Sequence, residues 1–95
     1  MSTIQNAASD LHYQPRTIAY LIEANDVNTL SNVAGDKKLD NVARLGAIEG
    51  LAMIANKESE KQLLSFGKDE NLDEELRKAC WRGLRRSKRR QAKKI

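Results

Sequence analysis

Apolar residues recur along most of this chain at intervals of three and four positions, which is the pattern of amphipathic helices. Aromatic residues make up only 4% of the chain, and no Asn-Gly or Asp-Gly dipeptide marks a strand hairpin. We therefore predict an all-α fold. The expected helices run from Ser2 or Thr3 to just before Gln14-Pro15, and then over about 15–25, 27–34, 40–55, 59–66 and from Asp73 onward.

The chain repeats itself at an offset of 33 residues. The aligned pairs are Leu30 with Leu63, Asp36 with Asp69, Leu39-Asp40 with Leu72-Asp73, Arg44 with Arg77, and Gly50-Leu51 with Gly83-Leu84. A fixed period in the low thirties is typical of solenoids, in which each helix pair stacks on its neighbour. We predict one domain over residues 1–95, with a degenerate first repeat at 3–25, a second at 27–55 and a third at 57–86.

The apolar stripes predict which side chains face the core. On the fourth helix they are Val42, Ala43, Ala47, Leu51 and Ile54, and we interpret Gly46 and Gly50 as sites of close helix approach. On the sixth helix they are Leu76, Ala79, Cys80 and Leu84. Only Ala92 is apolar between Arg85 and Lys94, so residues 85–95 are predicted to form a basic C-terminal tail, as a helix projecting into solvent or as a frayed end.

The spaced residues Asp36, Ala43-Arg44, Ala47 and Leu51, repeated as Asp69, Leu76-Arg77, Cys80 and Leu84, resemble HEAT repeats. They are closest to the short HEAT-like type of phycobilisome-lyase-like proteins. This resemblance implies a right-handed α-α superhelix of two to three helix pairs. It also implies a structural role for Asp36, Arg44, Asp69 and Arg77, since these positions usually bridge neighbouring units in the family. The family's Val-Arg dipeptide keeps its arginine twice here and its valine in neither unit.

Charge divides the chain in two. Residues 1–76 hold seven Lys/Arg and thirteen Asp/Glu, a net charge of −6, whereas residues 77–95 hold ten Lys/Arg and no acid. This basic end could be a solvated helix end or could bind nucleic-acid phosphates, an anionic membrane, an import receptor or an acidic protein. The candidate binding residues are Trp81, Arg82, Arg85, Arg86, Lys88, Arg89, Arg90, Lys93 and Lys94. Trp81 borders the apolar stripe, which favours packing in the core over base stacking.

Catalytic and metal-binding patterns are absent from the sequence. His12 is the only histidine and Cys80 the only cysteine, and no Gly-rich phosphate loop or nucleophile elbow occurs. We therefore expect no enzyme activity, no metal and no cofactor. Cys80 falls on an apolar face and is expected to be a small buried side chain. One unpaired cysteine and the lack of a ~20-residue apolar run predict an intracellular, cytoplasmic protein.

Together these features predict a non-enzymatic HEAT-like scaffold that mediates protein–protein interaction. The alternative is a helical-repeat module that binds nucleic acid by placing the basic C-terminal helix on phosphates. The resemblance also allows a third role, beside a cofactor-bearing partner protein. The sequence leaves the partner's identity and the oligomeric state open.

Overall fold

The computed structural model of the chain describes residues 15–93, and all its regular structure there is helical. The helices are α2 (Pro15–Glu23), α3 (Val27–Gly35), α4 (Asn41–Ile54), α5 (Lys57–Lys68) and α6 (Glu74–Lys93). The all-α prediction is thus confirmed, and the predicted helix bounds agree with these to within a few residues. Of the two alternatives for the basic end, α6 takes the helical one as far as Lys93. The helix predicted to begin at Ser2 or Thr3 lies outside the described residues.

Polar residues that precede three of the helices in the sequence cap their N-termini. Asp26, Asp40 and Asn56 each accept a hydrogen bond from a backbone N–H in the first turn of α3, α4 and α5. Such caps satisfy amides that have no partner inside the helix. Between α5 and α6 the chain continues through Asp73, and Glu74 and Glu75 follow in the first turn of α6, where carboxylates favour the helix dipole.

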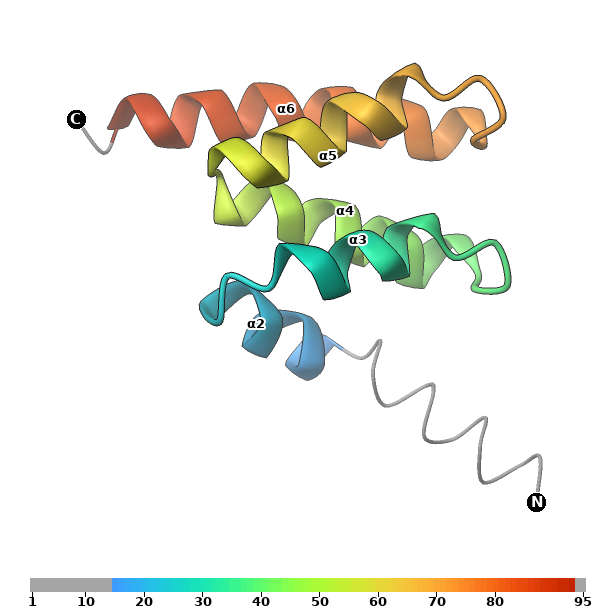
Figure 1. The fold of residues 1–95 in the computed structure, drawn as a ribbon, viewed down its shortest axis with the longest axis horizontal. Helices are drawn as coiled ribbons and strands as arrows, with labels where there is room; N and C mark the ends of the chain where they lie inside the picture. The colour runs from blue at the N-terminus through green and yellow to red at the C-terminus, as the bar shows by residue number, and fades with distance from the viewer. Residues whose placement is uncertain (1–14, 94–95) are drawn as a thin grey trace.

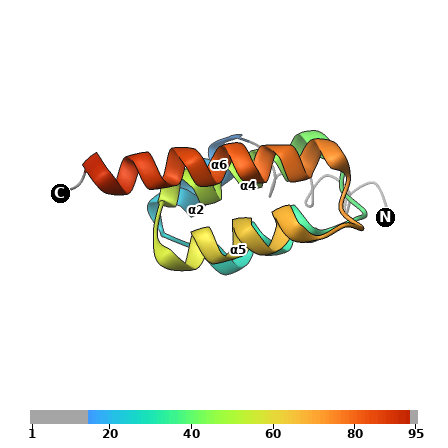
Figure 2. The same cartoon turned by 90° about the horizontal axis from the view of Figure 1, so that it is seen from above.

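The helices form two layers. Helices α2, α4 and α6 lie side by side in one layer, while α3 and α5 form the other (Figures 1 and 2). Helix α4 occupies the centre and packs against each of the other four helices. The α5/α6 pair forms one end of this stack, so that one side of the pair faces away from α4 (Figure 1).

The 33-residue repeat is visible in the backbone of two turns. Each turn follows a helix of the second layer, and its capping aspartate has φ and ψ of −81° and 106° at Asp36, and −79° and 104° at Asp69. In both, the aspartate Oδ1 accepts a hydrogen bond of 2.9 Å from the amide two residues later. The turns α3–α4 and α5–α6 are therefore two copies of one local structure.

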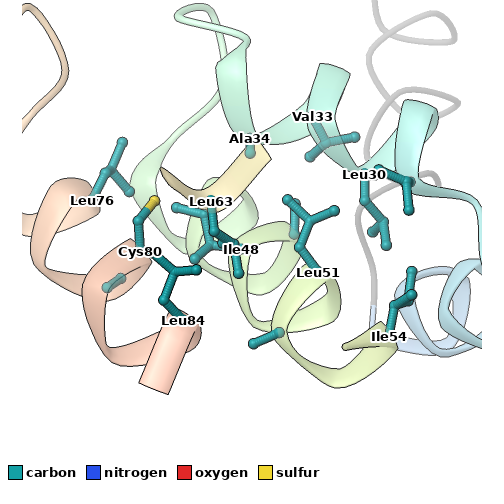
Figure 3. Packing of buried hydrophobic residues seen from close by; sticks show 14 of the residues in the cluster. Leu30, Val33, Ala34, Ile48, Leu51, Ile54, Leu63, Leu76, Cys80 and Leu84 are labelled. Atoms are coloured by element: carbon teal, nitrogen blue, oxygen red, sulfur yellow. The ribbon is translucent and has the colours of Figure 1, made fainter. Parts of the chain in front are cut away.

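Aligned leucines build the core between the layers. Leu30 of α3 and Leu63 of α5 both have an exposed fraction of 0% and lie 33 residues apart. They contact a buried face of α4 that includes Ile48 and Leu51, and Leu76 and Cys80 of α6 extend the same cluster (Figure 3). One continuous apolar cluster thus joins α3, α4, α5 and α6.

The predicted inward face of α4 is correct at Ala47, Leu51 and Ile54 and wrong at Val42, which is 80% exposed. Arg44 occupies the buried position instead, and its Nε donates a hydrogen bond of 2.9 Å to the carbonyl oxygen of Ala34. Val42 lies about 200° around the helix from Arg44, because each residue turns the helix by about 100°. The aliphatic stem of an arginine can pack in a core. Here Nε has an acceptor, whereas Nη2 is buried with no partner among the described residues.

Only one of the two α4 glycines serves close packing. A Cβ at Gly50 would lie 3.2 Å from Leu30 Cδ2 and 3.4 Å from Ile22 Cγ1, so α2 and α3 approach the α4 backbone there. A Cβ at Gly46 would meet nothing within 4 Å. The prediction of close approach is thus confirmed at Gly50 and wrong at Gly46.

These two glycines should respond in opposite directions to alanine. Gly46→Ala should raise the free energy of unfolding by about 0.5–1 kcal/mol, because alanine favours the helix and its methyl group meets no neighbour. Gly50→Ala should lower it by about 1 kcal/mol, because crowding against Leu30 outweighs that gain. Urea denaturation followed by circular dichroism measures both values, and a stabilising Gly50→Ala would contradict the packing of α3 on α4.

Candidate interaction surface

Helix α6 carries most of the predicted binding residues, and it is longer than its apolar stripe. It has 20 residues and continues to Lys93, so residues 85–93 belong to the same helix as Leu76 and Leu84. Lys94 lies outside the described residues. The basic run is therefore displayed on one regular helix whose first half is fixed in the core.

Two polar residues hold the second half of α6 against the body. Ser87 has an exposed fraction of 0%, and its Oγ donates a hydrogen bond of 2.8 Å to Oε2 of Glu60 on α5. One turn later, Nε2 of Gln91 donates a bond of 2.8 Å to the carbonyl oxygen of Ala55. These residues follow Leu84 at intervals of three and four, so they continue the buried face with polar side chains. A search for apolar residues alone misses them.

The cations of α6 lie on two sides of this anchored face. Arg85 and Lys88 point toward α5, beside Trp81, whereas Arg82 and Arg86 line a small hollow against α4. In that hollow Nη1 of Arg86 lies 3.9 Å from Oε1 of Glu49, and both side chains are mostly exposed. An exposed pair at this distance contributes little to stability. Arg89 and Arg90 are exposed as well.

A groove of about 660 Å³ runs between α5 and α6. Helix α5 contributes Lys57, Glu60, Lys61 and Leu64, and α6 contributes Trp81, Leu84, Arg85 and Lys88. Leu64, Trp81 and Leu84 are its apolar residues (the apolar floor), and Leu64 and Trp81 are 37% and 41% exposed. Its charged groups are four cations and one carboxylate, and that carboxylate already accepts the Ser87 hydrogen bond.

Trp81 rests on the backbone of α5. A Cβ built at Gly67 would lie 2.9 Å from Cε2 of the indole, so the absence of a side chain at Gly67 makes room for the ring. The indole is therefore partly packed and partly open to the groove. The sequence predicted its place at the edge of the core. It did not predict the groove, because the stripe of the fifth helix predicted that Leu64 is buried with Leu63 and Phe66. Leu64 is 37% exposed and lines the groove instead.

The two aspartates and two arginines that recur at the 33-residue offset act mainly within their own units. Asp36 and Asp69 accept amides of their own turns, and Arg44 binds the carbonyl of Ala34. The Nε of Arg77 is buried and has no partner among the described residues. A side-chain bond between units joins other residues, namely Asn41 Nδ2 to Asp73 Oδ2 at 2.8 Å.

Cys80 is fully buried among the leucines of the core, as predicted. Burial raises the pKa of its thiol from 9.0 to about 12, because the core cannot solvate a thiolate. A thiol in this state is a weak nucleophile at neutral pH.

Over residues 15–93, no three His, Cys, Asp or Glu side chains are grouped so that they could hold a metal ion. In the same part of the chain, no helix is both long and apolar enough to cross a membrane. Comparison of the chain with protein-family models, with curated proteins and with solved structures gave no match.

The polar anchors of α6 can be tested by removing one of them. Ser87→Ala should lower the free energy of unfolding by about 1 kcal/mol, since it deletes a buried hydrogen bond, and should speed amide exchange in residues 86–92. Ser65→Ala changes an exposed serine of α5 and serves as the control. Equal exchange in both variants would show that Ser87 does not anchor the helix.

Burial of Cys80 predicts how its reactivity depends on pH and folding. A disulfide reagent such as dithionitrobenzoate should label it at pH 8 only after unfolding in urea. Because the pKa is raised in the folded state, the thiol ionises at a lower pH in the unfolded chain than in the folded one. The free energy of unfolding should therefore fall between about pH 9 and 12, by up to about 1.4 kcal/mol per pH unit. Cys80→Ala removes this contribution, and rapid labelling of the folded chain would contradict the burial.

Proposed function

We propose that this protein is a non-enzymatic scaffold of the HEAT-like type that binds a protein partner through α6. The observation that carries this proposal is the anchoring of α6 by Ser87 and Gln91, which fixes a basic surface on a rigid helix. A charged run that merely kept the chain soluble would need no such anchors. The groove beside Trp81 adds apolar area, which protein interfaces use at their centres.

The HEAT-like part of the proposal draws support from the two copies of one turn and the two helix layers. A right-handed superhelix built from such pairs would present α4 and α6 on one face. The missing valine of the Val-Arg dipeptide is the main departure from the family pattern. Within this proposal the scaffold works in the reducing cytoplasm, where one unpaired cysteine stays reduced.

An acidic partner is favoured by the electrostatics of α6. Cations at spacings of three and four repel one another by a few tenths of a kcal/mol per pair, as for Arg82, Arg86 and Arg89. Carboxylates on a partner would relieve this repulsion and would also speed the encounter at low salt. Binding would then consist of steering by charge followed by packing on the exposed apolar side chains.

Nucleic acid is the second candidate, and one observation favours it. Lys78, Arg82, Arg85 and Arg89 are exposed and recur at intervals of three and four, so they form a basic row along the helix. Such a row can neutralise phosphates, with an affinity that falls steeply as salt is added. The row contains no aromatic side chain on which an unpaired base could stack.

A pull-down from the source organism separates these two functions. Wild-type protein should retain a protein partner that survives nuclease treatment, and Arg82→Glu with Arg89→Glu should lose it at least tenfold by quantitative mass spectrometry. Lys37→Glu with Lys38→Glu makes the same charge change in an exposed turn and should retain it. Material that disappears with nuclease would indicate the second candidate. Equal retention by all three baits would contradict a function of α6 in binding.

A further inference from the structure

The groove between α5 and α6 corresponds, at the 33-residue offset, to a surface of α3 and α4. On the α4 side the corresponding residues are Ile48, Leu51, Ala52 and Ala55, which are all buried. None of them is charged. On the α3 side, Val27 is buried, whereas Ala24 and Asn28 are exposed. The α4 half of this surface is thus covered, whereas its counterpart on α6 is open.

Helix α6 packs on the covered α4 half and not on α3. A Cβ at Gly83 of α6 would lie 3.2 Å from the Cβ of Ala52, so the two helices are close at this point. Gln91 reaches the carbonyl oxygen of Ala55 from the same side. Small residues at positions 52 and 55 therefore belong to a surface on which a helix packs.

On α6 the open surface keeps apolar residues at its centre and changes those at its edge. Trp81 replaces Ile48 and Leu84 replaces Leu51, whereas Arg85 and Lys88 replace the two alanines. On the α5 side Lys57 and Lys61 replace Ala24 and Asn28. A face of α6 that corresponds to the helix-receiving face of α4 is thus combined with a border of long cations, and Glu60 is the one carboxylate in the lining.

From this equivalence we propose that the α5/α6 groove is a docking site for an amphipathic helix of a partner protein, with Asp and Glu beside its apolar stripe. This inference rests on the proposed function and names the partner's chemistry. Trp81 and Lys88 lie two helical turns apart, about 10 Å along α6, so the docked helix needs apolar residues at i, i+3 or i+4, and i+7. A nucleic acid could meet the cations, but it has no side chains for the apolar floor.

The fluorescence emission of Trp81 reports on this site, because Trp81 is the single tryptophan of the chain. The probe is an acetylated and amidated 21-residue peptide with a stripe of Leu in a helix of Glu, Asp and Ala. A second peptide has the same composition in scrambled order, and a third carries Lys in place of the acids. The intact protein is titrated with each, and with a duplex oligonucleotide, while the Trp81 emission is recorded.

The acidic amphipathic peptide should shift the Trp81 emission to shorter wavelength and saturate, whereas the scrambled peptide should bind at least tenfold more weakly. Lys57→Glu with Lys61→Glu should weaken the binding at least tenfold, and Lys37→Glu with Lys38→Glu should not. Leu64→Ser should weaken it at least threefold, while Val42→Ser, which changes an exposed apolar residue outside the groove, should leave it unchanged.

Several results would overturn the inference. These are equal binding of the acidic and scrambled peptides, no binding of either, a preference for the basic peptide, or displacement of the peptide by the duplex. Sedimentation velocity tests a second copy as the occupant, and self-association that the acidic peptide cannot disrupt would exclude a partner helix. If Lys57→Glu with Lys61→Glu still retains the partner in the pull-down while Arg82→Glu with Arg89→Glu loses it, the docking site fails and the proposed function stands.

Discussion

The apolar contact of α4 with both layers is the interaction on which the rest of the structure depends. Leu51 of this helix and the leucines Leu30 and Leu63 of the second layer have exposed fractions of 0%, and each of the other described helices packs on α4. The termini of α3 and α5 are fixed by caps and identical turns, but these local features do not hold the layers together. Removal of this apolar contact would leave short helices, which are marginal in isolation.

The first half of α6 belongs to the same apolar contact, whereas its second half lies outside it. Its first half packs through Leu76 and Cys80, while its second half is held by polar bonds from Ser87 and Gln91. This change lets a strongly basic segment remain helical and stay close to the body. The apolar floor of the α5/α6 groove and the surrounding cations are thereby kept in one rigid arrangement.

The sequence predicted the parts of the fold that depend on local rules. Capping residues, the aspartate turns and the spacing of Ala47, Leu51 and Cys80 identified the helices and most of the core. It failed where tertiary contacts decide, since Arg44 is buried whereas Val42, which was predicted to face the core, is exposed. It missed Ser87 and Gln91 because buried polar residues give no hydrophobic signal. The groove was missed because Leu64 and Trp81 become neighbours only after α5 packs on α6.

We propose that the groove of α5 and α6 receives a helix on its α6 side, as the corresponding residues of α4 receive α6. Amide chemical-shift mapping of the ¹⁵N-labelled protein with the acidic amphipathic peptide tests it most directly. We predict that the largest shifts fall within residues 57–64 and 81–88, and that the bound peptide becomes helical. Shifts confined to the outer basic row around Arg82 and Arg89, or spread over α2 to α4, would contradict the claim.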